Sequence, residues 1–127
     1  MITPYTHEKH YEPLKKWLAH RGIKIPPRAM FSDFGYCVND TAIGFLFKTN
    51  SRQAFIDNIA ANPEKSKPER DLALRALYKE LEDEARRCGY LLVTTLSNLE
   101  TMKSRFENTG YRPFGTVTLF FKSLIGG

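Results

Sequence analysis

Asp57 is the carboxylate whose neighbours most favour proton transfer. It falls within Gln53 to Ala61, an apolar run before Asn62-Pro63 that we predict to be a β-strand. Alternation along a strand places Phe55, Asp57 and Ile59 on one face. A carboxyl group between two apolar neighbours is partly desolvated, which raises its pKa toward the range where it can accept a proton from an ammonium group. The alternative is an ordinary outward-facing strand residue.

Positive charge gathers around a predicted helix start a few residues further on. Ser66-Lys67-Pro68-Glu69 has the spacing of a capping box, in which the serine binds the third helical amide and the glutamate reaches back. Lys65, Lys67 and Arg70 surround this start and could hold phosphate groups as point charges. The alternative is a self-capped helix with basic surface residues, because the box occupies amides that an anion needs and the proline has none to offer.

The histidines and cysteines form no comparable cluster. Only His7 and His10 lie close together, with no third ligand nearby, so we expect no metal site. Cys37, in a predicted strand, and Cys88, at a helix end, fit the reduced thiols of a cytosolic protein better than a disulfide.

The stretch from Asn50 to Gly89, with the strand that follows it, must position these groups. A helix is predicted up to Cys88-Gly89, and a strand over Tyr90 to Leu96. The apolar face of the helix repeats at helical spacing and consists of Leu74, Leu77, Tyr78, Leu81 and Ala85. Strand, helix and strand in this length predict a right-handed crossover between parallel strands. Ligands bind beyond the carboxyl ends of such strands, so we expect the site between Asn58 and Arg70 and just after Leu96.

Shorter elements complete the predicted order. The further strands are Met1 to Tyr5 at an edge, Gly35 to Val38 and Ala42 to Lys48 joined by a turn at Asn39-Asp40, and closing strands at Tyr111 to Phe114 and Thr116 to Lys122. The further helices run from a Thr6 cap to Gly22, and from a Ser97-Asn98-Leu99-Glu100 capping box to Thr109-Gly110. The chain is therefore predicted to be a mixed α+β protein.

Length and charge set wider bounds. The 127 residues fit one domain over 1–127. A net charge of +5 favours anionic partners such as nucleic acid or a phosphate-bearing cofactor, although scattered basic residues also suit a solvated surface. We find neither a signal-peptide pattern nor a membrane-spanning apolar run, and expect a cytoplasmic protein without a membrane partner.

Three local patterns and the order of elements resemble the GCN5-related N-acetyltransferase family. The patterns are the apolar strand running into Asn62-Pro63, the step Arg75-Ala76-Leu77, and the helix end from Arg105 to Tyr111, which is similar to the family's tyrosine-glutamate-x-x-glycine-phenylalanine ending. The short chain looks like the small variants that bacteriophages encode. The resemblance implies a central mixed sheet with antiparallel N-terminal strands, one parallel crossover and flanking helices.

The resemblance also implies a co-substrate, acetyl-coenzyme A or another acyl-coenzyme A, held between the two parallel strands. In the family its pyrophosphate rests on backbone amides of a loop of pattern Gln/Arg-x-x-Gly-x-Gly/Ala. The closest registers here, Arg70 to Arg75 and Glu69 to Leu74, lack the glycines, so the loop is atypical. The positions that would bind the co-substrate are Ile59, Ala60, Ala61, Lys65, Lys67, Arg70 and Asn98.

Acyl transfer to an amine needs a base, a donor for the oxyanion and an acid for the leaving thiolate. The resemblance gives the base to Asp57 and the oxyanion to a backbone amide near Ile59 to Ala61. The family often places the acid on a tyrosine of its last helix, where this chain has Phe106, so Tyr111, Ser104 and Ser97 are the substitutes. The acceptor is an unknown amine. Two alternatives remain, a non-catalytic protein of this fold that binds protein or nucleic acid, and one that modifies DNA bases.

Overall fold

The computed structural model of the chain describes residues 1–95, 106, 108–115, 118, 120 and 122–124. The chain divides into two compact units, Met1–Leu96 and Ser97–Gly127. The predicted single domain over 1–127 stays a prediction. None of the helices in the described residues is long and apolar enough to cross a membrane. Their two cysteines are unpaired thiols, buried at Cys37 and exposed at Cys88.

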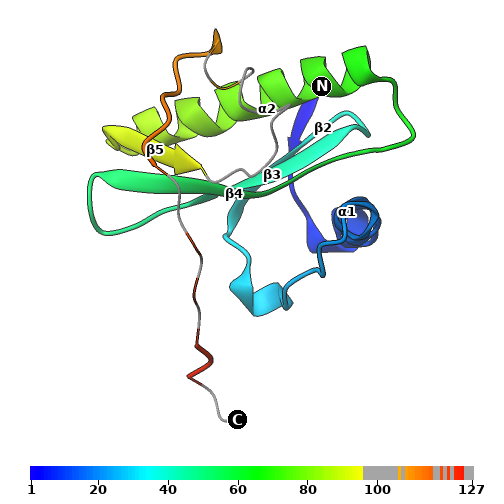
Figure 1. Cartoon of the computed structure of the whole chain (residues 1–127), viewed down its shortest axis with the longest axis horizontal. Coiled ribbons are helices and arrows are strands. Elements are labelled where there is room, and N and C mark those ends of the chain that lie inside the picture. The colour runs from blue at the N-terminus through cyan, green and yellow to red at the C-terminus, as the bar shows by residue number, and fades with distance from the viewer. Residues whose placement is uncertain (96–105, 107, 116–117, 119, 121, 125–127) are drawn as a thin grey trace. The chain divides into compact units, whose positions relative to one another are not determined.

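The first unit is built on a five-stranded sheet in sequence order (Figure 1). Its strands are β1 (Ile2–Pro4), β2 (Phe34–Val38), β3 (Ala42–Phe47), β4 (Gln53–Ala61) and β5 (Leu92–Thr95). Neighbours from β1 to β4 pair antiparallel, and β4 pairs parallel with β5 across the crossover. The predicted mixed α+β class, with antiparallel N-terminal strands and one parallel crossover, is confirmed.

Two helices cover opposite faces of this sheet. Figure 1 shows α2 (Lys67–Arg87) along one face and α1 (His7–His20) against the other. The predicted apolar face of α2 is buried throughout. The core on the other face combines α1 with three strands and consists of Leu14, Trp17, Leu18, Cys37, Ile43, Phe45 and Ala60. A short 3-10 helix at Arg28–Met30 leads from α1 back to the sheet.

The start of α1 is capped differently from the prediction. Thr6 occupies the cap position, but its side chain makes no capping hydrogen bond. The imidazole of His10 instead accepts the Thr6 N–H at its Nδ1 atom, 2.9 Å away. The ring of His10 also lies 5.6 Å from that of Tyr5. A side chain one turn into the helix therefore serves the cap, because it can reach back to the preceding backbone.

The described residues of the second unit contradict the two predicted closing strands. Residues 111–115 belong to no strand, and neither do 118, 120 and 122. The Tyr111 N–H donates to the Phe106 carbonyl as part of the helix end, and Pro113 has no N–H, so two positions of this segment cannot donate to a ladder. The predicted helix end is confirmed by the turn at Thr109 and Gly110, whereas its capping box at 97–100 lies outside the described residues.

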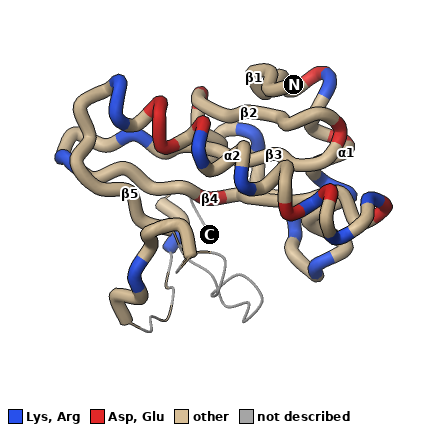
Figure 2. Tube along the Cα trace, turned by 90° about the horizontal axis from the view of Figure 1, so that it is seen from above, with Lys and Arg blue, Asp and Glu red and all other residues tan. Residues whose placement is uncertain are grey.

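Charge on α2 is largely paired within the helix. Figure 2 shows its Lys and Arg positions interspersed with Asp and Glu positions. Ion pairs along the helix join Lys67 to Asp71 at 3.0 Å, Lys79 to Asp83 at 2.9 Å, and Arg87 to Glu84 at 2.8 Å. Exposed pairs of this kind add little stability. They do neutralise the helix surface, so α2 presents no uniformly basic face.

Candidate functional site

The two parallel strands pair over only part of their length. The register runs from Gln53 opposite Leu92 to Ile56 opposite Thr95, the last described residue of β5. β4 continues to Ala61. Within the described residues, the edge of β4 from Asp57 onward therefore has no strand beside it on the β5 side. This edge lies at the carboxyl end of the parallel pair, where the crossover predicts a ligand.

A β-bulge shapes the same stretch of β4. Phe45 lies opposite Asp57 and Ile43 opposite Ala60, so Asn58 and Ile59 together face one residue, Gly44. Asn58 has a φ of 55°, which asparagine tolerates better than most residues.

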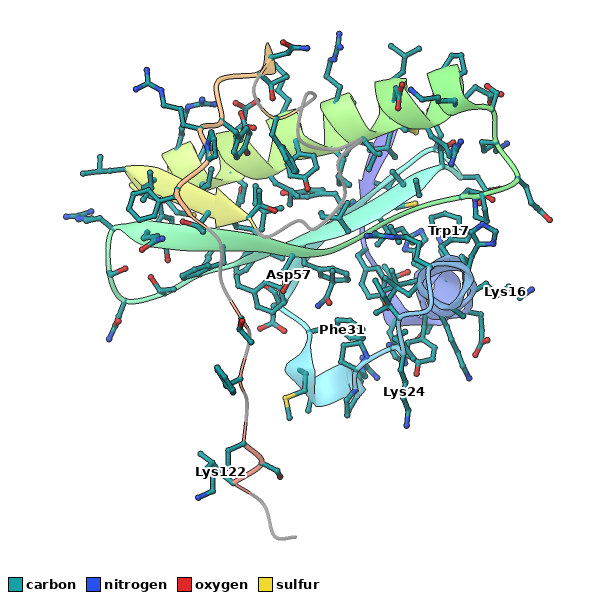
Figure 3. All side chains as sticks on the ribbon, viewed as in Figure 1. Lys16, Trp17, Lys24, Phe31, Asp57 and Lys122 are labelled. Carbon is teal, nitrogen blue, oxygen red and sulfur yellow. The ribbon has the colours of Figure 1, made fainter. Side chains whose placement is uncertain are left out.

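Gly44 is needed for this close approach. A Cβ atom there would lie 2.2 Å from Ile59 Cδ1 and 3.0 Å from Leu77 Cδ2 of α2. The side chain of Ile59 therefore lies on the α2 side of the sheet. Asp57 lies on the opposite side with Phe45, and Figure 3 shows it on the same side as Phe31.

The predicted environment of Asp57 is wrong. The bulge moves Ile59 to the other face, and the remaining neighbour, Phe55, is 40% exposed. Asp57 itself is exposed, so the desolvation expected from alternation is absent. Its carboxylate accepts the N–H of Asn58 at 2.7 Å. The structure thus holds an accessible carboxylate directly beside the bulge.

Aromatic rings surround Phe45, the residue paired with Asp57. Phe31 stacks on it with centroids 5.2 Å apart, and Tyr5 meets it edge-on at 4.8 Å. Phe47 packs half-buried against the same core. The Tyr5 hydroxyl is shielded from solvent and has no hydrogen-bond partner among the described residues, and burial raises the pKa of this phenol. The face that Asp57 shares is therefore apolar and aromatic.

Three of the residues that shape the end of β4 were not predicted from the sequence. Gly44 and Asn58 create the bulge, and Arg21, just after α1, donates from Nη1 to the Ile59 carbonyl at 3.1 Å. The positive φ available to asparagine was a weak signal for a bulge, and nothing local indicated the reach of the arginine. These residues fix the backbone of Ile59, Ala60 and Ala61.

The loop between β4 and α2 is anchored by Asn62, which is 6% exposed. Its backbone N–H donates to the Thr41 carbonyl at 2.7 Å, and its side-chain amide donates to the Asp40 carbonyl at 3.0 Å. Its Oδ1 atom accepts the Glu64 N–H at 3.0 Å. The loop is therefore fastened to the β2–β3 turn.

The predicted capping of α2 by Ser66 is confirmed. The Ser66 hydroxyl oxygen accepts the Glu69 N–H at 3.3 Å, and the hydroxyl group donates to the Glu69 carboxylate at 2.9 Å. The Arg70 N–H donates to the Ser66 carbonyl at 3.0 Å, as helical bonding requires. Pro68 has no N–H, so Lys67 retains the one N–H among residues 67–70 that has no hydrogen-bond partner in the described part of the chain.

The three basic candidates lie around this helix start in different states. Lys67 is paired with Asp71. Arg70 is half-buried, and its Nε atom is shielded with no hydrogen-bond partner in the described residues. Lys65 is half-buried in the loop. Of the three, Lys67 already has a carboxylate partner that a phosphate group would have to displace.

The remaining candidates lie in the other unit. Tyr111 is half-buried, and its ring lies 5.3 Å from that of Phe106. Asn98 and Ser104 lie outside the described residues. The described site therefore comprises the β4 edge with its bulge, Asp57, the aromatic face and the start of α2.

No protein-family model and no curated protein matches this chain by sequence. Solved structures match its fold. A probable acetyltransferase matches with a TM-score of 0.73 and 18% identity, over 97% of this chain and 99% of its own. An acetyltransferase from Trypanosoma brucei matches with a TM-score of 0.68 and 15% identity, over 96% and 99%. An aminoglycoside N-acetyltransferase in complex with CoA matches with a TM-score of 0.61 and 15% identity, over 97% and 99%. The chain thus has the fold of the GCN5-related N-acetyltransferases.

Proposed function

We propose that this protein is an N-acyltransferase that moves an acyl group, such as acetyl, from a coenzyme A thioester to an amine. The observation that carries the proposal is the bulge at Asn58 and Ile59, on the β4 edge that has no described strand beside it beyond Ile56. An extended ligand can lie against such an open strand edge and use its backbone groups. The shared fold supports this assignment.

The acyl-pantetheine arm of the donor would run along β4 from Asp57 to Ala61. A bulge leaves the N–H of its extra residue out of the ladder, so this group is available to a ligand, whereas the Ile59 carbonyl is already held by Arg21. A backbone N–H in the segment of Ile59, Ala60 and Ala61 would then stabilise the oxyanion that forms at the thioester carbonyl.

Asp57 would receive the proton of the amine. The amine nitrogen attacks the thioester carbonyl, the C–N bond forms, the C–S bond breaks and the thiolate takes up a proton. Because Asp57 is exposed and beside the bulge, an amine can approach it from solvent. Its negative charge would bind the ammonium form before deprotonation. Tyr111 and Ser104 remain the candidates for protonating the thiolate.

The first experiment separates catalysis from simple binding. A thermal melt with acetyl-coenzyme A at about 100 times its dissociation constant should stabilise the native state by roughly 2.7 kcal/mol. Turnover is then measured with a panel of amines, peptides and DNA. Absence of both stabilisation and turnover would refute the transferase and favour a non-catalytic binding protein of this fold.

The second experiment tests Asp57. Asp57→Asn should lower kcat by roughly a hundredfold or more and leave stabilisation by acetyl-coenzyme A unchanged, because the lost interaction belongs to the transition state. Asp40→Asn, a change at an exposed aspartate in the β2–β3 turn, is the matched control and should keep wild-type kcat. An Asp57→Asn protein that retains turnover would remove Asp57 from the mechanism.

A further inference from the structure

We infer that this site recognises the acyl-pantetheine arm of its donor and not the diphosphate of coenzyme A. Thioesters of pantetheine that lack the diphosphate, whether free or attached to a carrier protein through a single phosphate, should then be donors no worse than acetyl-coenzyme A. The inference rests on the proposed N-acyltransferase function. Three features of the α2 start carry it.

The first feature is the shortage of backbone donors. A diphosphate at a helix start is held by N–H groups that the helix leaves unpaired. Here the Glu69 N–H is taken by the Ser66 hydroxyl, and the Arg70 N–H by the Ser66 carbonyl. Pro68 has none. Within residues 67–70 this leaves the Lys67 N–H as the one donor without a partner among the described residues, and a single N–H cannot form the cradle that a diphosphate requires.

The second feature is negative charge at the same place. The Glu69 carboxylate lies 2.9 Å from the Ser66 hydroxyl, and thus occupies the position where the helix dipole favours an anion. The ammonium of Lys67 is held by Asp71 at 3.0 Å. A diphosphate would have to approach the first carboxylate and compete with the second. Lys65 and Arg70 would have to offset both.

The third feature is the lack of glycine in the loop before α2 and at the helix start, where a cradle of backbone amides would have to form. No glycine occurs between residues 62 and 88, so every position near the helix start carries a side chain. The hydrogen bonds of Asn62 to the Asp40 and Thr41 carbonyls also fix the loop before the helix. Rearrangement would break these bonds as well as the cap of α2.

The β4 edge, in contrast, keeps what a pantetheine arm needs. Its amide groups can pair with an open strand in the same way as a peptide backbone. Among the described residues, β4 offers this edge from Asp57 to Ala61, beyond its pairing with β5. The part of the site that handles the thioester is therefore present, and the part that would handle the diphosphate is closed.

Donor truncation tests the inference directly. We would compare kcat/KM for acetyl-coenzyme A, S-acetylpantetheine and an acetylated carrier protein, with an amine from the panel as acceptor. We expect the kcat/KM values for acetyl-coenzyme A and S-acetylpantetheine to differ by no more than roughly threefold. A site that binds the diphosphate would instead give acetyl-coenzyme A a kcat/KM higher by about a hundredfold or more. The larger ratio overturns the inference and leaves the proposed function intact. A further gain with the carrier protein would identify it as the source of the donor.

A binding measurement covers the case in which no acceptor is found. Pantetheine should raise the melting temperature as much as coenzyme A does at equal saturation, and ADP should not raise it. Stabilisation by ADP would contradict the inference. Absence of stabilisation by any of these compounds would refute the inference together with the proposed function.

Glu69→Gln provides the matched change in the protein. Glutamine keeps the size of the side chain and suits a capping box, so the helix start is preserved while the charge is removed. If the carboxylate repels the diphosphate, the dissociation constant of coenzyme A should fall several-fold and that of pantetheine should stay unchanged. Glu12→Gln, at an exposed position of α1, should alter neither. Equal effects of Glu69→Gln on both ligands would overturn this account of the helix start.

Discussion

Removing one hydroxyl group should loosen the parallel pair of strands. The Tyr90 hydroxyl donates to the Thr49 carbonyl at 2.6 Å and accepts the Thr49 N–H at 2.8 Å. Thr49 lies between β3 and β4, and Tyr90 precedes β5, so this side chain links the segments that lead into the two parallel strands. Tyr90→Phe keeps the ring and removes both hydrogen bonds.

The loss of stability in Tyr90→Phe follows from the two backbone groups of Thr49 that lose their hydrogen-bond partner. Both Thr49 groups lose their partner in a half-buried position, where water replaces part of the lost bonding. A buried unpaired polar group costs roughly 1–3 kcal/mol, so we expect about 2 kcal/mol for the two half-buried groups together. With an unfolding entropy of about 2.1 cal/mol/K per residue, this lowers the melting temperature by about 7 °C.

Thermal unfolding followed by circular dichroism measures this change. Tyr11→Phe is the matched control, because the Tyr11 hydroxyl has no hydrogen bond to the described residues, and we expect a shift below about 2 °C. A Tyr90→Phe protein that melts within the same narrow range as wild type would show that the hydroxyl bridge does not stabilise the fold. The assumed linkage between the β3–β4 turn and β5 would then be wrong.

Three further predictions concern other parts of the first unit. Ser66→Ala should lower the free energy of unfolding by about 1 kcal/mol through loss of the α2 cap, and an unchanged urea midpoint would contradict that role. Gly44→Ala should cost roughly 1–3 kcal/mol, because its Cβ would meet Ile59 at 2.2 Å, and wild-type stability would show that the bulge yields easily. Burial and the nearby Lys9 charge lower the pKa of His10 below its usual 6.5, so the folded state favours the neutral imidazole. The stabilisation that the folded state gains from neutral His10 is fully present above about pH 6.5 and is lost as the pH falls through the folded pKa. The wild type should therefore lose more free energy of unfolding on acidification than His10→Gln does. Equal losses in the two proteins would contradict this role of His10.

The sequence by itself determined the elements whose causes are local. The length and apolar face of α2 follow from contacts one turn apart, and its start and end follow from Ser66 and from Gly89, which has a φ of 83°. The hairpin at Asn39 is equally local, because that residue accepts a φ of 54°. With these elements placed, the crossover rule also predicted the region of the candidate site. The segment of Ile59, Ala60 and Ala61 does lie at the end of β4.

Only the tertiary structure decided the features that depend on residues distant in sequence. Alternation placed Ile59 beside Asp57, but the bulge that separates them requires Gly44 on the neighbouring strand. The register of β4 with β5, which places Gln53 opposite Leu92, likewise depends on a strand distant in sequence, and the predicted end of that strand at Leu96 lies outside the described residues. The pattern of a strand predicts which side chains alternate between the two faces of the sheet. The backbone of the partner strand sets the register and the exposure of those side chains. For that physical reason the sequence predicted the region of the candidate site, and the fold determined that Asp57 is exposed.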